Sequence, residues 1–326
     1  MTLVRETFAR LSGLPEIQAE LDAPLSRHTR FGIGGPADIY AETGNAETFI
    51  EALRIAQESG LETVVIGSGT NLIVSDDGFR GVVLKLANRG LSSDGASVHA
   101  ESGVPLQALV DFTIDRGLKG LDTMTGIPGS TGAAVYGNAG AYGHSISESI
   151  LTVRFFDGSS IRDFQNTECH FQYRESIFKK HKDWIILSAD LLLTPDDSAA
   201  LRASADKILT VRNQKYPPTM KCAGSIFKNF ILSDLPPEVA GLIPSKAVIE
   251  GKVPSAWFLE QVGAKGMSRG DIHVAAYHAN LIYNGGGGTA RDLAAIIREL
   301  KDRVRERWGI ALNEEVQYVG MKNFGN

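Results

Sequence analysis

Apolar residues recur at the 3.6-residue spacing of a helix in several stretches of the chain. Over residues 46–60 this spacing ends at a glycine, as expected for an amphipathic helix. Similar stretches predict helices over residues 106–117, 195–215 and 254–262. The strongest helix begins at Thr289-Ala-Arg-Asp292, which has the form of a capping box with Asp in place of Glu. Its apolar face is formed by Leu293, Ile296, Ile297, Leu300 and Val304.

Short β-branched and apolar runs between these helices predict strands. They lie at residues 63–67, 72–74, 81–86 and 316–319, and the region 150–193 is predicted to be mainly strand. Helices and strands do not alternate regularly, so the pattern indicates an α+β fold and not a series of βαβ units. The pair Pro217-Pro218 is the best candidate for a domain boundary.

Composition and charge narrow the classes of function. The chain has 326 residues, enough for two or three domains, and 43% of them are hydrophobic. Its net charge of −5 argues against a protein that binds nucleic acid or a membrane surface. Residues 1–22 do not form a signal peptide, and apolar stretches such as 185–193 are far shorter than the ~20 residues that span a bilayer. With only Cys169 and Cys222, no disulfide framework is expected, and we expect a cytoplasmic protein.

Glycine is concentrated in clusters, the first candidate ligand sites. Gly67-Ser-Gly-Thr-Asn71 follows a predicted strand, and N–H groups in such a loop can bind a diphosphate. The loop is not a Walker A motif, because no Gly-Lys-Ser/Thr follows. It is not a Rossmann fingerprint either, because a strand follows it instead of a helix. A purely structural turn remains the alternative for this and every other glycine cluster.

A second glycine-rich loop is longer and more specific. It comprises Gly126-Ile-Pro-Gly-Ser-Thr-Gly132 and Tyr136-Gly-Asn-Ala-Gly-Ala-Tyr-Gly143, with six glycines within 18 residues. Backbone of this kind can lie flat against a planar ring system while its amides bond to the ring. A structural turn would not need so long a segment, which favours a ligand-binding loop.

These loops resemble a known flavin-binding domain. Arg30-Phe-Gly-Ile-Gly-Gly-Pro-Ala-Asp38, the 67–71 loop, Gly126–Ser130 and Gly140–Gly143 resemble the FAD-binding domain of the UDP-N-acetylenolpyruvoylglucosamine reductases, which also occurs in vanillyl-alcohol oxidase and p-cresol methylhydroxylase. The resemblance implies that the first loop holds the FAD pyrophosphate and the second runs beside the isoalloxazine. Some members of this superfamily attach the flavin covalently through His or Cys. The second loop has only His144 at its edge and no Cys, so we expect FAD to be bound without a covalent link. The implied FAD contacts are Arg30, Gly34, Gly67, Ser68, Gly69, Thr70, Asn71, Leu72, Gly126, Ile127, Pro128, Gly129, Ser130, Gly132, Asn138 and Ala139.

Further motifs distinguish the reductases from their oxidase relatives. They are Tyr173–Ser176, Cys222–Asn229 and Leu312–Val316, supported by Phe258–Gly266 and His278–Asn280. They occur in the family's order, and the resemblance covers about residues 23–320. Arg174 and Ser225 are only 51 residues apart, which resembles the second reductase subtype, without an extra tyrosine-bearing loop. The chain departs from the family at Phe230, where proline is usual, and at Asn313-Glu314, where an acidic residue and proline are common.

The resemblance also implies roles for individual residues. Arg174 would bind the substrate carboxylate or the developing enolate, Glu315 would donate to the same carboxylate if burial keeps it protonated, and Ser225 would protonate carbon. The implied substrate contacts are Tyr173, Lys215, Lys228, Asn229, Lys265 and His278. No metal is expected. Taken singly, each of these residues has an ordinary structural or solvated alternative.

The implied activity is reduction of UDP-N-acetylglucosamine enolpyruvate by NADPH through FAD, in a ping-pong cycle that supplies peptidoglycan synthesis. The implied architecture has two α+β FAD-binding subdomains, residues 1–85 and 86–205, an α+β substrate-binding domain, residues 206–308, and a C-terminal strand and tail, residues 309–326. We expect a monomer whose partners are small molecules. The alternatives are a flavin oxidase of the same superfamily and a nucleotide-sugar sensor without catalytic activity.

Overall fold

The computed structural model describes residues 2–321 and divides the chain into two compact units. Each unit collects separate segments of the chain. The first unit contains Met1–Ala23, Ala37–Ser68 and Arg80–Pro218, and the second contains Pro24–Pro36, Gly69–Phe79 and Thr219–Asn326. The chain crosses from the first unit to the second for the last time directly after Pro217-Pro218, the predicted domain boundary. An earlier crossing falls between Ser68 and Gly69, inside the first glycine-rich loop. The finer four-part division stays a prediction.

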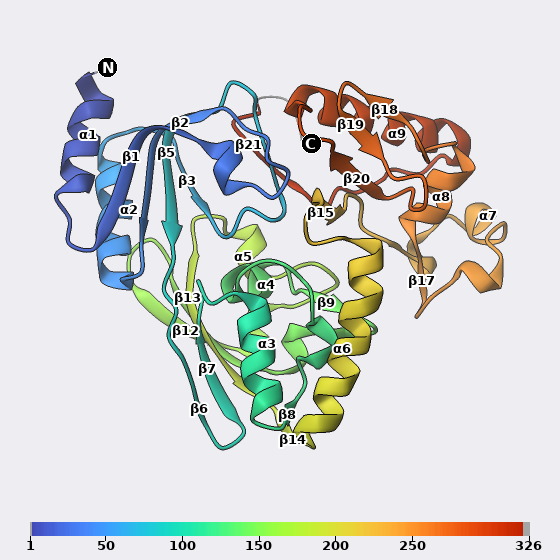
Figure 1. The fold of residues 1–326 in the computed structure, drawn as a ribbon, viewed down its shortest axis with the longest axis horizontal. Coiled ribbons are helices and arrows are strands. Elements are labelled where there is room, and N and C mark those ends of the chain that lie inside the picture. Colours follow the sequence, from blue (N-terminus) through green and yellow to red (C-terminus); the bar gives the residue numbers. More distant parts are fainter. Residues whose placement is uncertain (1, 322–326) are drawn as a thin grey trace. The chain divides into compact units, whose positions relative to one another are not determined.

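One part of the first unit is a four-stranded sheet with the strand order β1-β2-β5-β3. Its strands are β1 (Ile17–Pro24), β2 (Pro36–Thr43), β3 (Thr63–Ile66) and β5 (Phe79–Leu86). Two neighbouring helices, α1 (Thr2–Ser12) and α2 (Ala46–Glu58), pack beside each other (Figure 1). Asn45 caps α2 by accepting from two backbone N–H groups, and the helix buries Phe49 and Leu53.

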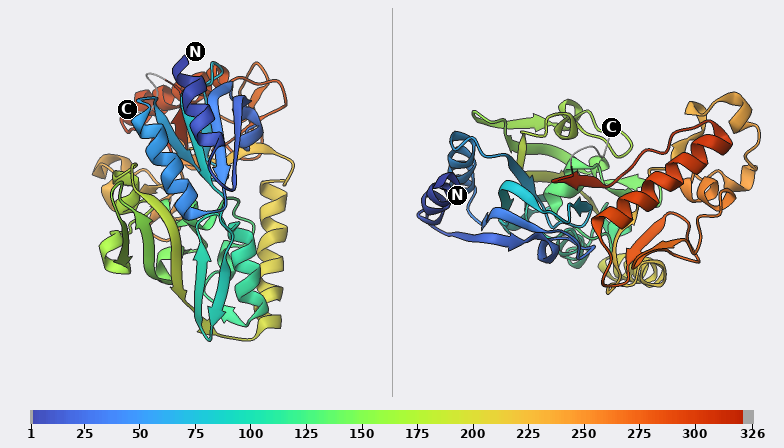
Figure 2. Two further views of the ribbon diagram at one scale, coloured as in Figure 1. Left: turned by 90° about the vertical axis from the view of Figure 1, so that its left-hand side faces the viewer. Right: turned by 90° about the horizontal axis from the view of Figure 1, so that it is seen from above.

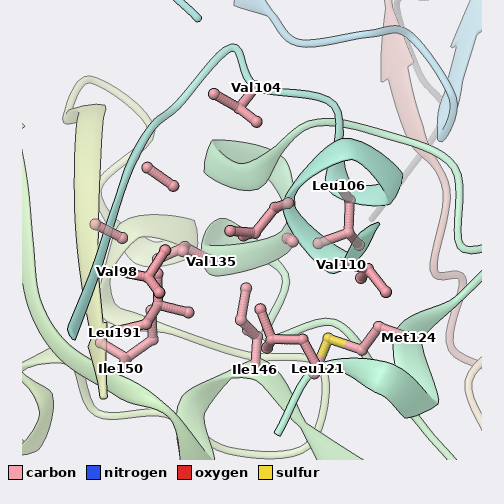
Figure 3. Packing of buried hydrophobic residues seen from close by; sticks show 14 of the residues in the cluster. Val98, Val104, Leu106, Val110, Leu121, Met124, Val135, Ile146, Ile150 and Leu191 are labelled. Carbon is pink, nitrogen blue, oxygen red and sulfur yellow. The ribbon is translucent and has the colours of Figure 1, made fainter. Parts of the chain in front are cut away.

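The other part of the first unit is a five-stranded antiparallel sheet with the order β12-β11-β13-β7-β6. Its strands are β6 (Leu91–Asp94), β7 (Ser97–Glu101), β11 (Ile150–Phe156), β12 (Ile161–Gln165) and β13 (Ile185–Leu192). The buried faces of β7, β11 and β13 share a core with α3 (Leu106–Asp115) and α4 (Thr131–Tyr136). Figure 3 shows Val98, Leu106, Val135 and Leu191 pointing into this core.

A long helix, α6 (Ser198–Lys215), lies against α3 and ends just before the proline pair. Asp197 caps its first turn by accepting from the Ala200 N–H group, 2.7 Å away. The remaining short elements of this unit are β8 (Leu118–Lys119), β9 (Gly140–Ala141), β10 (His144–Ser145), α5 (Ile177–Lys180) and β14 (Thr194–Pro195).

The second unit is built on the sheet β15-β20-β19-β18 and the helix α9 (Ala290–Trp308). The strands are β15 (Lys221–Ser225), β18 (Ser268–Arg269), β19 (Ile272–Val274) and β20 (Leu281–Asn284). The right-hand view of Figure 2 shows α9, in orange-red, along this part of the chain. A separate parallel pair joins β4 (Leu72–Val74) to β21 (Gln317–Val319). The other elements are β16 (Phe230–Ile231), α7 (Pro237–Ala240), β17 (Lys252–Val253) and α8 (Ser255–Gln261).

Most elements predicted from the periodicity are confirmed, including α2, α3, α6, α8, α9 and the strands β3, β4, β5 and β21. Thr289 caps α9 through the Asp292 N–H group, as predicted. No helix within residues 2–321 is both long enough and apolar enough to cross a membrane.

One prediction about local structure was wrong. The second glycine-rich segment is not a continuous loop, because it contains the short helix α4. Ser130 caps this helix, and Gly132 brings it against Ser102, where any Cβ atom on residue 132 would lie 2.7 Å from the Ser102 Cβ. Part of the glycine content of this segment therefore serves close packing.

Candidate active site

The first glycine-rich loop, Gly67–Asn71, joins β3 to β4. Gly69 has a φ of +65°, and a side chain there would overlap the carbonyl oxygen of His28, so glycine is required. The Arg30 N–H group donates to the Gly69 carbonyl oxygen at 3.1 Å. Gly34 has a φ of +137° and lies against β4. Three of the predicted FAD contacts, Arg30, Gly34 and Gly69, are thus gathered around one turn of the second unit.

Asn71 connects this loop to the C-terminal segment. Its side-chain Nδ2 donates to the Glu315 carbonyl oxygen at 2.8 Å, and its own carbonyl oxygen accepts from the Gln317 N–H group at 3.0 Å. Leu72 then pairs with Gln317 as β4 and β21 run in parallel. A residue predicted to bind the cofactor therefore fixes the backbone of a residue predicted to act in catalysis.

The second glycine-rich segment meets the first loop within the first unit. Gly126 and Gly129 have φ values of +78° and +130°, which few other residues adopt. Ser130 directly follows Gly129 and caps α4. Ser130 also meets the first loop, because a Cβ atom on Gly67 would lie 3.3 Å from the Ser130 Oγ. The remaining predicted FAD contacts of this segment lie before, in and directly after α4: Ile127, Pro128, Gly132, Asn138 and Ala139.

Asn138 ties the end of this segment to the region that carries Arg174. It is buried, has a φ of +43°, and donates from Nδ2 to the Gln172 carbonyl oxygen at 2.9 Å. On the other side, the Ser176 hydroxyl donates to the Tyr136 carbonyl oxygen at 2.7 Å. The backbone on both sides of Arg174 is therefore anchored to the second glycine-rich segment.

Arg174 itself adopts the left-handed backbone conformation, with a φ of +57°. A non-glycine residue in this region is strained, and such strain concentrates at functional sites. Its Nη2 donates to the Gly140 carbonyl oxygen at 2.7 Å and its Nη1 to the Asn138 carbonyl oxygen at 3.4 Å. The guanidinium carbon lies 5.3 Å from the centre of the Tyr173 ring. The cation is thus held on backbone carbonyls of the second segment.

Ser225 and Glu315 lie on adjacent, hydrogen-bonded backbones in the second unit. The Glu315 N–H group donates to the Ile226 carbonyl oxygen at 2.8 Å, and the Lys228 N–H group donates to the Asn313 carbonyl oxygen at the same distance. These two bonds form an isolated antiparallel bridge, which sets the C-terminal segment beside the end of β15. The structure thus places the backbones that carry two of the three predicted catalytic residues beside each other.

Asn280, which the sequence did not single out as a functional residue, holds the Ser225 segment from the other side. Its Oδ1 accepts from the Phe227 N–H group at 2.9 Å, and its Nδ2 donates to the Phe227 carbonyl oxygen at 2.8 Å. Its carbonyl oxygen also accepts from the Ile226 N–H group. His278 Nδ1 accepts from the Asn280 N–H group at 3.1 Å, which shows that His278 supports this turn.

Lys228 and Asn229 continue the same segment and contact Ser255 at the start of α8. The Ser255 hydroxyl donates to the Lys228 carbonyl oxygen, and the Ser255 N–H group donates to the Asn229 Oδ1 at 3.3 Å. Lys265 lies further along the chain and forms an ion pair with Glu260, with a distance of 2.9 Å between Nζ and Oε1. Their predicted contacts with substrate stay predictions.

Lys215 lies in the last turn of α6, in the first unit. Its ammonium is 5.2 Å from the Tyr216 ring centre, and local desolvation, followed by the charge of Arg212, lowers the pKa of Lys215 even though the residue is exposed. Arg212 also packs against Gly126, with its Cδ 3.2 Å from the position of a Cβ there. This end of α6 therefore adds positive charge beside the second glycine-rich segment.

Comparison with known proteins agrees with both halves of this arrangement. A model of the FAD binding domain matches residues 37–160, and a model of the C-terminal domain of UDP-N-acetylenolpyruvoylglucosamine reductase matches residues 216–319. The reductase of Solibacter usitatus is 61% identical over 311 residues, which cover 95% of this chain and 100% of that protein. The reductase of Rubrobacter xylanophilus is 36% identical, covering 93% and 95%. The chain belongs to the UDP-N-acetylenolpyruvoylglucosamine reductase family.

A solved structure supports the same assignment. The reductase of Thermus caldophilus aligns with a TM-score of 0.71 and 27% identity, covering 93% of this chain and 98% of that one. The predicted fold class is confirmed: an α+β FAD-binding domain of the vanillyl-alcohol oxidase type precedes an α+β C-terminal domain. This member of the reductase family is an FAD-dependent oxidoreductase.

The two glycine-rich segments of this reductase fit a flavin dinucleotide. The N–H groups of Ser68, Thr70 and Ser130 take no part in the backbone hydrogen bonds of the helices, strands and turns within residues 2–321, so they can donate to a ligand. Glycine at position 67 lets the two segments approach closely, because a Cβ atom there would be crowded by Ser130. Within the same part of the chain, no group of His, Cys, Asp and Glu is arranged to hold a metal ion.

The structure thus collects the predicted residues of the reductase into two sets, one in each unit. Arg174, Tyr173 and Lys215 belong to the first unit, with the second glycine-rich segment. The second set contains Ser225, Lys228, Asn229, Lys265, His278 and Glu315. The predictions missed Asn280 and the pairing of Asn71 with Glu315. The only sequence signal for Asn280 was its place in the motif His278-Ala-Asn280.

Proposed function

We propose that this enzyme reduces the enolpyruvyl double bond of UDP-N-acetylglucosamine enolpyruvate with NADPH, giving UDP-N-acetylmuramate for peptidoglycan synthesis. The observation that supports the proposal is the backbone bridge between the Ser225 segment and the Glu315 segment, because it sets the backbone that carries a hydroxyl next to the backbone that carries a carboxyl. Membership of the reductase family supports the substrate class. The two glycine-rich segments would hold FAD, which would supply the transfer of hydride from NADPH to the sugar in a ping-pong cycle.

The protein's own groups manage charge and protons. Hydride adds to the terminal carbon of the enolpyruvyl group, and the electron pair of the double bond moves toward the carbon that bears the carboxylate. Arg174 supplies a permanent positive charge for that carboxylate and the developing enolate. Glu315, in its protonated form, donates a hydrogen bond to the same carboxylate. Ser225 gives its proton to the adjacent carbon and regains one from solvent.

The substrate contacts follow from the same proposal. A nucleotide diphosphate that also carries a carboxylate is strongly anionic, and the chain has a net charge of −5, so local cations must bind it. We assign Lys215, Lys228 and Lys265 to the phosphates of the sugar nucleotide or NADPH. Tyr173, Asn229 and His278 are the further substrate contacts in this proposal. The enzyme acts on small molecules as a cytoplasmic monomer, which size-exclusion chromatography with light scattering would test.

The test is an anaerobic titration followed by flavin absorbance. The oxidised flavin band bleaches with NADPH and returns with UDP-N-acetylglucosamine enolpyruvate if both half-reactions occur. Ser225→Ala retains bleaching but slows the return by about 10²–10⁴-fold, the usual effect of removing a proton donor. Ser233→Ala, at an exposed serine of the same unit, serves as the matched control. Return of the band only on admission of air would refute the proposal in favour of an oxidase.

A further inference from the structure

Glu314 precedes Glu315 in the chain and makes contacts that the reaction does not require. Successive side chains of an extended segment project to opposite faces. The Glu314 Oε1 lies 2.6 Å from the Nζ of Lys301, which belongs to α9. The Glu314 side chain is 11% exposed and that of Lys301 is 25% exposed. This is a mostly buried ion pair, less accessible to solvent than a typical surface pair.

Tyr318 joins the same cluster from beyond the bend in the C-terminal segment. Burial, followed by a hydrogen bond to Glu314, raises the pKa of Tyr318 above its usual range. Arg298, one turn before Lys301 on α9, adds positive charge near the Tyr318 hydroxyl. Glu314 is therefore contacted by one helix and by its own strand.

The backbone of this segment is held on both of its edges. The Asn313 carbonyl oxygen and the Glu315 N–H group bond to the Ser225 segment, and Asn71 accepts from Gln317. These bonds set the backbone of the segment at two points, and the ion pair with Lys301 adds a side-chain attachment on α9. A side chain anchored on α9 therefore constrains the direction of the next side chain along the segment.

We propose that Glu314 is a positioning residue: anchored by Lys301 of α9, it fixes the direction in which Glu315 presents its carboxyl group beside Ser225. The inference rests on the proposed function in that Glu315 and Ser225 act on the enolpyruvyl group. A side-chain anchor at residue 314 restricts the segment, as a proline there would do through its ring.

The first test measures the segment itself and does not depend on activity. Hydrogen–deuterium exchange of the FAD-loaded enzyme reports on the Glu315 and Gln317 amides. Glu314→Gln keeps the shape of the side chain but removes its charge, and we expect exchange in the peptide covering residues 313–319 to accelerate severalfold. The control is Glu299→Gln, which removes the 2.6 Å ion pair with Arg303 on the same helix. Unchanged exchange in Glu314→Gln would overturn the proposal.

The second test separates positioning from general destabilisation. Glu314→Gln and Lys301→Met should each slow reoxidation by the enolpyruvyl sugar about tenfold, since small misplacements of catalytic groups are costly, while reduction by NADPH stays within about twofold. The double variant should be no slower than either single variant, because both remove one interaction. Lys301→Arg should restore most of the rate.

Equal slowing of both half-reactions would mean that the pair is merely structural and would overturn the proposal. If the sugar fails to reoxidise even the unaltered enzyme, the proposed function falls, and the exchange experiment still decides whether Lys301 and Glu314 hold the segment.

Discussion

Asn280→Ala should destabilise the second unit and disturb the proton-donating segment together. Asn280 is 2% exposed and Phe227 is 1% exposed, so water cannot replace the lost amide. The substitution leaves both the N–H and the C=O group of Phe227 without their partners at 2.9 and 2.8 Å. An unsatisfied buried polar group costs about 1–3 kcal/mol, so the two together should lower the free energy of unfolding by about 2–6 kcal/mol.

The assay is urea unfolding followed by tryptophan fluorescence, combined with single-turnover reoxidation. Trp257 and Trp308 both belong to the second unit, with ring centres 5.2 Å apart, and report on its unfolding. Because Phe227 is only two residues from Ser225, we expect reoxidation by the enolpyruvyl sugar to slow as well. Reduction by NADPH should change little in the fraction that remains folded and retains FAD.

The matched control is Asn45→Ala in the first unit. Asn45 also accepts two backbone hydrogen bonds, at 2.9 and 3.0 Å, but it does so at the solvent-accessible end of α2. Its removal should cost only about 1 kcal/mol and leave both half-reactions intact. A loss below about 1 kcal/mol in Asn280→Ala, or equal slowing of reoxidation in Asn45→Ala, would refute the reasoning.

Three further outcomes are expected. Gly69→Ala should abolish FAD binding, because a Cβ atom there overlaps the His28 carbonyl oxygen. The control is Gly60→Ala: Gly60 has a φ of +72° and open space around it, so the substitution should lower the free energy of unfolding by about 1–2 kcal/mol and retain FAD. A flavin fluorescence titration would separate the two variants. Burial, followed by the charge of Glu168, raises the pKa of Cys169 from 9.0 to about 12. Above pH 9 the unfolded chain therefore binds fewer protons than the folded chain, and the free energy of unfolding should fall as pH rises toward 12. In urea titrations, Cys169→Ala should make this slope shallower by up to about 1.4 kcal/mol per pH unit. Asp76→Ala should lower the midpoint temperature of unfolding of the second unit, because Asp76 accepts from the Ala290 and Arg291 N–H groups at the start of α9. A shift of this midpoint below about 1 °C would contradict the capping role.

Helices and most strands could be predicted because their signals are local. The apolar face of α9 repeats every three or four residues, and its Thr289 cap stands directly before it. The second cap of the same helix comes from Asp76, more than 200 residues earlier, and no local pattern could indicate it. Short α4 was missed for a related reason: its two-turn length gives no periodicity, and its formation depends on Ser130 and on packing against Ser102.

The candidate site likewise has residues that the sequence could indicate and long-range contacts that it could not. The resemblance to the reductase motifs was enough to single out Arg174, Ser225 and Glu315, and the proposed chemistry needs a cation, a proton donor and a carboxyl group. The hydrogen bonds that place these residues were not predictable. Asn71 and Glu315 are 244 residues apart, and Asn280 and Phe227 are 53 apart. Such contacts follow from the register of β21 on β4 and of the bridge beside β15, which topology determines.

The bridge would also accommodate a different residue at position 314. Its two hydrogen bonds use the N–H groups of Lys228 and Glu315, and the N–H group of Glu314 takes no part in them. A proline at this position would therefore keep both bonds, since the donor it lacks is not needed. Glutamate keeps them equally and adds its contact with Lys301. Position 314 can thus change from proline to glutamate without moving the Glu315 backbone, whereas proline at position 315 would remove the donor to Ile226 and break the bridge.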